Sequence, residues 1–201
     1  MPHNEPLKIG AVVLAAGLSS RMGGQKMLLA WKEKTVIETV VETLISSGMG
    51  EMVVVLGRDA EQISKLLAKQ DIHIVFNPEF ANGHMVTSLV TGLRMLQGKV
   101  DAALMVLGDQ PQMSGATITQ MVEEWKQNPL SLCIPSYRMR RGHPWVIPAR
   151  LWDGLYNLGL QQTMRDFIGM NEQDIRYVVV DTPSILADLD TPEDYKGQKL
   201  D

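Results

Sequence analysis

The sequence predicts an α/β fold, a three-layer sandwich in which helices cover both faces of a mainly parallel sheet. Short apolar runs rich in β-branched residues recur along the chain, and amphipathic segments with helical periodicity separate them. Several of these runs are apolar at successive positions, which is typical of strands buried on both faces. Strands that alternate with helices form βαβ units with right-handed crossovers, and such units build a mainly parallel sheet.

The apolar runs, taken in order, are the expected strands. They are Ile9–Leu14, Met52–Leu56, Ile72–Phe76, Ala102–Leu107, Leu132–Ile134, Trp145–Ile147 and Ile175–Val180. In a sheet of this kind ligands bind beyond the carboxyl ends of the strands, so function is expected in the loops that follow them. These loops are the one after the first run and the segments Asn77–Ser88, Gly108–Met113, Tyr137–Pro144 and Asp188–Asp194.

Capping residues mark where the helices begin. Thr35 and Glu38 have the spacing of a capping box, and Ser114 is the expected cap of the helix that follows it. Asp59 precedes an amphipathic run that extends to Lys69. Near the end of the chain, Thr191-Pro192 places a cap residue before a proline at the first helical position.

Length and composition predict one domain, residues 1–201 with a core of about 8–196, because no shift in composition divides the chain. The formal net charge of −4 argues against nucleic acid as a partner. No apolar run approaches the roughly 20 residues that span a bilayer, so no membrane partner is expected. The single cysteine, Cys133, argues against a disulfide and a zinc site and favours a cytoplasmic protein.

The loop after the first run combines glycines, hydroxyl side chains and two cations. These are Gly17, Ser19, Ser20, Arg21, Gly23, Gly24 and Lys26. Glycine lets the backbone approach a ligand closely, and exposed N–H groups with nearby cations suit phosphate oxygens. Neither G-x-x-x-x-G-K-[ST] nor G-x-G-x-x-G occurs here. The residues leave two interpretations open, a solvated turn or a cradle for phosphates.

Carboxylates stand in two of the loops beyond the strands. Asp109 follows a buried strand in "MVLGDQPQMS", and Asp188 and Asp190 lie in "ILADLDTPEDY". Two acidic loops at one edge of a sheet suit Mg²⁺, which takes one or two carboxylates and binds substrate phosphates with other positions. The alternative is that these residues cap the helices that follow, as Asp190 beside Thr191 suggests.

An arginine cluster and two tryptophans each allow a structural and a functional interpretation. Arg138, Arg140 and Arg141 form a basic cluster beside the "GHP" turn, either solvated or recognising phosphate. Trp31 and Trp152 lie among aliphatic residues, which favours packing over stacking on a ligand.

Several stretches of the chain, in order, carry a family resemblance: "LAAGLSSRMGGQKMLL", "NPEFANGHMVTSLVTGL", "LGDQP", "RGHP" and "DLDTPEDY". From about Val12 to Tyr195 the sequence resembles the MobA-like nucleotidyltransferases, which attach CMP or GMP to molybdopterin. The resemblance is closer to the cytidylyltransferase branch and to related accessory proteins of xanthine dehydrogenase and purine catabolism. It implies a Rossmann-like nucleotidyltransferase sheet.

The resemblance also implies roles for individual residues. The implied nucleotide-binding residues are Leu14, Ala15, Ala16, Gly17, Ser19, Ser20, Arg21, Lys26, Asn77, Gly83, Ser88 and Gly108. The implied catalytic residues are Arg21, Lys26 and Asp109. The implied Mg²⁺ ligands are Asp109 and Asp190, with Asp188 as a further ligand, and the implied acceptor-binding residues are Gly142, His143, Pro144 and Arg165.

The substrates follow from the same resemblance. The guanylyl branch usually has glycine where this chain has Ala16, so CTP is favoured over GTP. The implied acceptor is molybdopterin or molybdenum cofactor, and the implied recipient is a molybdenum hydroxylase such as a xanthine dehydrogenase-type apoenzyme. The family's acceptor-side Gly-Asp-x-Gly-x-Arg is reduced here to "LQQTMRDF", which keeps only Arg165. A sugar or polyol phosphate as acceptor, and a non-catalytic cofactor carrier, therefore stay open as alternatives.

Overall fold

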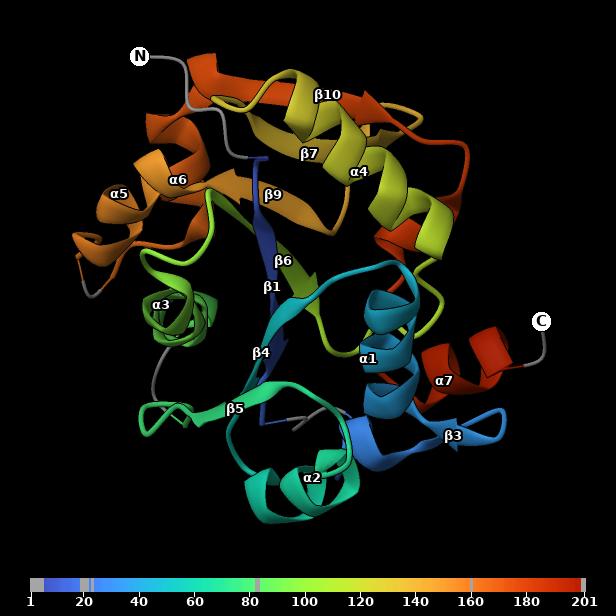
Figure 1. Cartoon of the computed structure of the whole chain (residues 1–201). Helices are drawn as coiled ribbons and strands as arrows, with labels where there is room; N and C mark the ends of the chain where they lie inside the picture. The colour runs from blue at the N-terminus through green and yellow to red at the C-terminus, as the bar shows by residue number, and fades with distance from the viewer. Residues whose placement is uncertain (1–5, 19–21, 23, 82–83, 160, 200–201) are drawn as a thin grey trace.

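Every strand that the sequence predicts is present in the computed structural model, which describes residues 6–18, 22, 24–81, 84–159 and 161–199 (Figure 1). They are β1 Ile9–Ala15, β4 Glu51–Leu56, β5 His73–Phe76, β6 Ala102–Leu107, β7 Leu132–Tyr137, β9 Trp145–Pro148 and β10 Ile175–Val179. The sequence analysis missed the short strands β2 Ala30–Trp31, β3 Lys34–Thr35 and β8 Arg140–Arg141. Strands of this length are too short to carry an alternation of apolar and polar side chains.

The sheet is mainly parallel, as predicted. Its strand order is β10-β7-β9-β6-β1-β4-β5, with β8 paired to β7, while β2 and β3 form a separate ribbon. The central strand β1 runs parallel to β4 on one side and to β6 on the other. The exceptions are β9, which runs antiparallel to its neighbours β6 and β7, and the short β8, which runs antiparallel to β7. The carboxyl ends of the parallel strands therefore meet at one edge, the edge where ligands bind in such sheets.

Helices cover both faces of this sheet and complete the three layers. They are α1 Val36–Ser46, α2 Ala60–Leu67, α3 Met85–Leu96, α4 Gly115–Gln127, α5 Trp152–Tyr156, α6 Met164–Met170 and α7 Pro192–Lys199. Short 3₁₀ turns lie in the connections between elements: η2 Lys26–Leu28, η3 Ala149–Leu151, η4 Glu172–Asp174 and η5 Pro183–Leu186. None of the described helices is long and apolar enough to cross a membrane.

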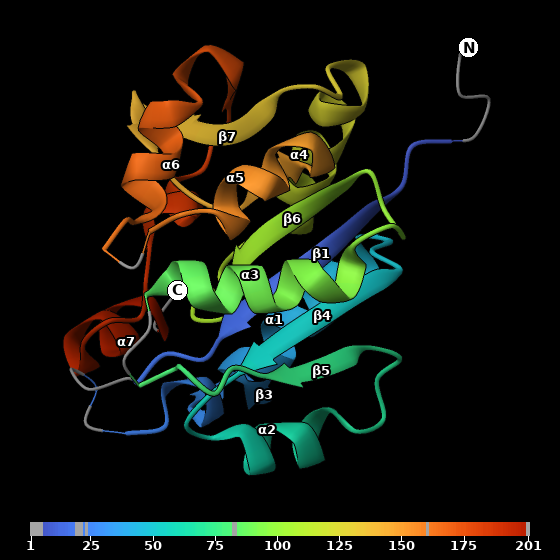
Figure 2. The ribbon, with the colours of Figure 1, turned by 90° about the vertical axis from the view of Figure 1, so that its left-hand side faces the viewer.

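The two faces of the sheet carry separate cores. Residues of α1, α2 and α4 pack in one cluster with Val13, and residues of α3, α5 and α6 pack in the other with Val12. Figure 2 shows α3 lying across β1 and β4. Val12 and Val13 are neighbours in β1, and both are fully buried, on opposite faces of the sheet. Burial on both faces explains why β1 has no polar side chain.

Predicted caps begin several of the helices. Thr35 Oγ1 accepts the N–H of Glu38 at 3.4 Å, and the Glu38 carboxylate accepts the N–H of Thr35 at 2.9 Å. Ser114 Oγ accepts an N–H from the first turn of α4 at 3.2 Å. Thr191 forms a reciprocal pair with Asp194, whose pKa is lowered by hydrogen bonds from the Thr191 hydroxyl and backbone N–H. These bonds satisfy N–H groups that the helices leave without partners.

The second helix departs from its prediction. Asp59 stands at the N-cap of α2, but its side chain makes no capping hydrogen bond. The helix ends at Leu67, short of the predicted Lys69. The buried positions of α2 end at the same residue, so the segment beyond it gains no packing from the helical conformation.

The last segment of the chain crosses back to the β2–β3 ribbon and the start of α1. Leu189 is fully buried against Trp31 and Val36, so Trp31 packs in a core, as expected. The Leu189 N–H donates to the carbonyl oxygen of Asp109 at 3.3 Å. This crossing brings the carboxylates on either side of Leu189 to the edge where β1 and β6 end.

Candidate active site

A cavity of about 340 Å³ lies beyond the carboxyl ends of β1 and β6. It is lined by Leu14, Ala16, Gly17, Lys26, Met27, Phe80, His84, Met85, Ser88, Leu107, Asp109, Asp188 and Asp190. These residues come from segments that are far apart in the sequence: the loop after β1, η2, the loop after β5, the start of α3, the loop after β6 and the segment after η5. The topology thus brings many of the predicted site residues around one space.

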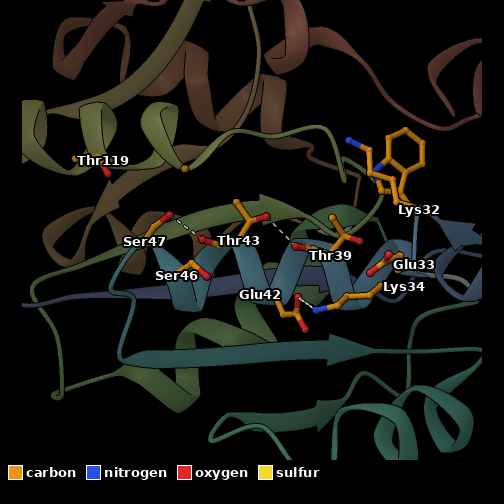
Figure 3. A pocket seen from close by; sticks show the side chains of 11 residues that line it. Lys32, Glu33, Lys34, Thr39, Glu42, Thr43, Ser46, Ser47 and Thr119 are labelled. Carbon is orange, nitrogen blue, oxygen red and sulfur yellow. Dashed lines mark hydrogen bonds and ion pairs between the residues drawn. The ribbon is translucent and has the colours of Figure 1, made fainter. Parts of the chain in front are cut away.

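A larger hollow of about 670 Å³ lies elsewhere, between α1, the start of α4 and the β2–β3 ribbon (Figure 3). Hydroxyl side chains of α1 line it, and the ammonium of Lys34 contacts the carboxylate of Glu42 at one end. The hydroxyls of Thr43 and Ser47 donate to carbonyl oxygens of their own helix. Of the predicted site residues that the structure describes, none lines this hollow.

An ion-pair cluster forms the charged end of the smaller cavity. Lys26 Nζ lies 2.7 Å from Asp109 Oδ2 and 3.0 Å from Asp190 Oδ1. Only 8% of the Lys26 side chain is exposed, against 18% for Asp109 and 36% for Asp190. The cluster joins residues that are 83 and 164 positions apart in the sequence. Two carboxylate oxygens therefore converge on one cationic position.

Asp109 and Asp190 stabilise the positive charge of Lys26. Burial alone lowers the pKa of a lysine, but the charges and hydrogen bonds of Asp109 and Asp190 outweigh it and raise the pKa of Lys26. Lys26 thus carries a fixed positive charge at neutral pH. A buried ammonium of this kind can pair with phosphate oxygens as readily as with carboxylates.

Asp188 lies beside this cluster with a different partner. Its Oδ1 accepts a hydrogen bond from Gln110 Nε2 at 2.7 Å. Burial is the largest cause of its raised pKa, and the negative charges of Asp109 and Asp190 add to it. Gln110 is itself almost fully buried, at 1% exposure. Asp188 therefore borders the cavity as a carboxylate held in place by an amide.

The described part of the loop after β1 lines the cavity through Ala16 and Gly17. A side-chain carbon added at Gly17 would meet no atom of the described residues within 4 Å. Arg58 Nη1 donates to the carbonyl oxygen of Leu18 at 3.0 Å and ties this loop to the end of β4. Ser19, Ser20, Arg21, Gly23 and Gly83 lie outside the described residues.

Tight packing brings Asp109 close to β1. A side-chain carbon at Gly108 would lie 3.0 Å from the Leu14 carbonyl oxygen and 3.1 Å from Ala15 Cβ. The Gly108 N–H donates to that same oxygen at 3.0 Å. Gly108 and Ala15 therefore pack behind the residues that line the cavity, and neither of them lines it. Leu14 and Ala16 line it directly.

In the second predicted loop, the two nucleotide-binding candidates that the structure describes, Asn77 and Ser88, differ in position. Ser88 lines the cavity from within α3, so the loop ends before it and the helix begins at Met85. Asn77 is 2% exposed and does not line the cavity. Its Nδ2 donates to Ser88 Oγ at 3.0 Å, and its Oδ1 accepts the Glu79 N–H at 3.0 Å. Asn77 thus anchors the loop to α3.

The predicted acceptor side is divided between two places. Arg165 lines a cavity of about 430 Å³ together with His84 and Met85, which also line the first cavity. Gly142, His143 and Pro144 line neither of them.

His143 is held against the protein instead of facing either cavity. The His143 ring stacks on Trp145 with 5.0 Å between centroids, and the backbone N–H of His143 donates to the Ile185 carbonyl oxygen at 3.0 Å. Burial lowers the pKa of His143 to about 4, so the ring is neutral at physiological pH. A neutral imidazole offers no positive charge to an acceptor phosphate.

Two arginines of the predicted cluster lie against tyrosine rings, one in β7 and one in β10. The Arg138 guanidinium lies 5.1 Å from the Tyr137 ring centre, and that of Arg141 lies 5.1 Å from the Tyr177 ring centre. None of the three predicted arginines lines either of the two cavities described above.

Sequence reasoning missed the apolar part of the cavity. Met27, Phe80, Met85 and Leu107 all line it. Each stands within one to four residues of a predicted site residue, yet an apolar side chain next to a motif carries no signal of its own. Only the assembled fold distinguishes such a residue from core.

The fold and the site together define a class of protein. The site combines a glycine-containing loop, a buried lysine and converging carboxylates at the carboxyl edge of an α/β sheet. This combination is typical of enzymes that bind nucleoside triphosphates. Residues 11–175 match the MobA-like NTP transferase domain, and the chain belongs to this family. The resemblance seen in the sequence is thereby confirmed.

Relatives and solved structures agree with this assignment. The chain is 33% identical over 149 residues to nicotine blue oxidoreductase of Paenarthrobacter nicotinovorans, over 71% of this chain and 72% of that protein. It is 27% identical over 188 residues to molybdenum cofactor cytidylyltransferase of Escherichia coli strain K12, over 93% of each chain. A nucleotidyl transferase from Methanothermobacter thermautotroptrophicus has a TM-score of 0.82 at 27% identity, over 96% of each chain. The protein is a nucleotidyltransferase by family and by fold.

Proposed function

We propose that this nucleotidyltransferase transfers CMP from CTP to the terminal phosphate of molybdopterin and releases pyrophosphate. The observation that carries the proposal is the contact of Lys26 with both Asp109 and Asp190 beside the loop after β1. The relative named molybdenum cofactor cytidylyltransferase supports the choice of substrates, because it matches this chain over nearly its whole length.

In the proposed reaction, an oxygen of the acceptor phosphate attacks the α-phosphorus of CTP. A new P–O bond forms there, and the bond from the α-phosphorus to the bridging oxygen of the β-phosphate breaks, so pyrophosphate leaves with the electron pair. A phosphate monoester is largely dianionic at neutral pH, because its second pKa is about 6, so the attacking oxygen needs no general base. Catalysis then consists of positioning and charge stabilisation.

Lys26 supplies charge stabilisation in this scheme. Its ammonium exchanges carboxylate contacts for oxygens of the triphosphate and balances the charge that grows on the leaving pyrophosphate. Arg21 is proposed to share this task, on the strength of its place in the family motif. The backbone N–H groups of the loop after β1 are proposed to orient the α-phosphate.

Asp109 and Asp190 fit a divalent metal. Their oxygens already converge on one cation, the ammonium of Lys26. Among the described residues no group of three metal-binding side chains forms a closed cage, and Mg²⁺ bound with nucleotides needs only one or two carboxylates. We propose that they hold Mg²⁺, with Asp188 nearby, and that the ion supplies Lewis-acid stabilisation of phosphate oxygens.

Ala16 is proposed to favour CTP over GTP, since it lines the cavity where the guanylyl branch usually has glycine. We propose a molybdenum hydroxylase as the recipient of the product. A different phosphorylated acceptor is the second candidate, because Gly142, His143 and Pro144 do not line the cavity that holds Lys26. A non-catalytic carrier would bind the finished cofactor without turnover.

The relative named nicotine blue oxidoreductase raises a redox function as a further candidate. The lysine–carboxylate cluster favours nucleotidyl transfer, because charge pairing with phosphates is what such a cluster supplies.

The test is Mg²⁺-dependent release of pyrophosphate from CTP, GTP, ATP and UTP in turn, each with purified molybdopterin and with or without molybdate. Release with CTP, absent when molybdopterin is omitted, is the expected result. Release with a sugar phosphate or polyol phosphate, but not with molybdopterin, would identify that compound as the acceptor. No release, with tight binding of the finished cofactor, would favour the carrier.

A further inference from the structure

Phe80 lines the active-site cavity from a turn that is anchored at several points. The Phe80 N–H donates to the Asn77 carbonyl oxygen at 3.2 Å, and the Asn77 side chain accepts the Glu79 N–H at 3.0 Å. Asn77 also donates through its amide to Thr87 and Ser88 on α3. The turn is therefore fixed to the helix that forms one wall of the cavity.

The end of β4 is shaped to receive the same residue. A side-chain carbon added at Gly57 would lie 2.8 Å from Phe80 Cβ and Cγ, and 2.5 Å from the Ala16 carbonyl oxygen. Only glycine leaves room at this point for Phe80 and the loop after β1 together. The Phe80 ring also meets Phe76 in an edge-on contact, with 5.8 Å between centroids.

The sheet topology separates this aromatic group from the charged cluster. Strand β1 lies between β4 and β6. Phe80 packs at the end of β4, whereas Asp109 follows β6, so they stand on opposite sides of the β1 loop. Two strand spacings of about 4.8 Å each separate β4 from β6. This span suits a nucleotide whose base and triphosphate lie at opposite ends.

We propose that Phe80 is the platform on which the nucleobase stacks, while the triphosphate extends past Gly17 to Lys26. Asn77 acts through Phe80 as a positioning residue and does not touch the nucleotide. The inference rests on the proposed function, since it assumes that the cavity holds a nucleoside triphosphate. An aromatic platform suits every base because each has a π-face, so Phe80 supplies affinity and leaves the choice among bases to other contacts.

The test compares two probes, CTP and inorganic triphosphate, which lacks a base. Both are titrated by calorimetry, with Mg²⁺, into the wild-type protein and into the variants Phe80→Leu, Phe80→Tyr and Phe76→Leu. Phe80→Leu is expected to weaken CTP binding about 5- to 100-fold, the range known for loss of one base–aromatic stack. Triphosphate binding is expected to change less than about twofold, since the triphosphate end lies on the β6 side.

The other variants serve as matched controls. Phe80→Tyr keeps the ring and is expected to retain CTP binding. Phe76 contacts Phe80 but is 50% exposed and does not line the cavity, so Phe76→Leu is expected to leave both affinities close to those of the wild type. The thermal midpoint of each variant establishes that it is folded.

Distinct results would overturn the inference. Equal loss of CTP and triphosphate binding in Phe80→Leu would mean that Phe80 only shapes the loop. Unchanged CTP binding in Phe80→Leu, or an equal loss in Phe76→Leu, would also contradict stacking on Phe80. Failure of the wild-type protein to bind CTP would overturn the proposed function together with this inference, which distinguishes the two failures.

Discussion

At the scale of single residues, the site depends on one buried ammonium between two carboxylates. Lys26 is nearly inaccessible, and its charge is stabilised by Asp109 and Asp190. Removal of the ammonium leaves two partly buried carboxylates facing one another without a counter-ion, and it removes a cation from the proposed path of the triphosphate. The same residue therefore matters for both the folded site and the reaction.

Lys26→Met is expected to lower kcat/KM for pyrophosphate release by about 100-fold or more, the usual effect of losing one charge-stabilising group. Steady-state kinetics with CTP and molybdopterin measure it. Lys34→Met is the matched control, because Lys34 also pairs with a carboxylate but does so at an exposed position away from the cavity. Comparable activity in Lys26→Met and the wild type would remove Lys26 from the mechanism.

A second residue-scale prediction concerns pH. Since the pKa of His143 falls from 6.5 to about 4 in the folded protein, the unfolded chain binds more protons between these pH values. Stability is therefore complete above about pH 6.5 and is lost as pH falls toward 4, at up to about 1.4 kcal/mol per pH unit. Urea unfolding at pH 7.5 and pH 5 is expected to show a smaller loss in His143→Asn than in the wild type. An equal loss in both proteins would contradict the shift, and His73→Asn, at an exposed position, is the control.

At the scale of elements, close packing of α3 on the sheet places Ser88 and the loop anchored by Asn77. Gly92 is the contact that allows this approach, since a side-chain carbon there would lie 2.3 Å from Val12 Cγ1 and 3.0 Å from Val55 Cγ2. Both neighbours belong to strands of the sheet and are fully buried. The position of α3, and with it one wall of the cavity, depends on that glycine.

Gly92→Ala is expected to lower the free energy of unfolding by about 1–3 kcal/mol, because it overpacks the interface between α3 and β1. Gly169→Ala, in α6, is the matched control: a side-chain carbon there meets no atom within 4 Å, so the change is expected to stabilise by up to about 1 kcal/mol. Urea denaturation measures both variants. A neutral Gly92→Ala would mean that α3 can move away from the sheet without cost.

At the scale of the whole molecule, the sheet lies between two cores, and Leu189 of the last segment packs against Trp31 of β2 and Val36 of α1. We propose on this basis that the chain is one domain. Urea unfolding followed by circular dichroism and by tryptophan fluorescence is then expected to give coincident transitions, as is usual for a single domain that unfolds cooperatively. Two separated transitions would indicate independent units.

The strands and several helix caps could be predicted from the sequence because local signals specify them: the apolar runs and the pair Thr35 and Glu38 are examples. The antiparallel direction of β9 could not, because a short apolar run reads the same in either direction. In the site, charged residues such as Asp109 stood out by type and position. Phe80 did not, since its exposure to the cavity depends on contacts with Gly57 and Asn77 that only the fold creates.

The most direct test of the central claim is Mg²⁺-dependent pyrophosphate release from CTP and molybdopterin by the wild-type protein and by Asp109→Asn. Asn is nearly isosteric with Asp but lacks the charge that pairs with Lys26 and that we propose holds the metal. We expect release by the wild type and a loss of about 100-fold or more in Asp109→Asn, with unchanged circular dichroism. Full activity in Asp109→Asn would contradict it, because the reaction would then proceed without the carboxylate on which the site is built.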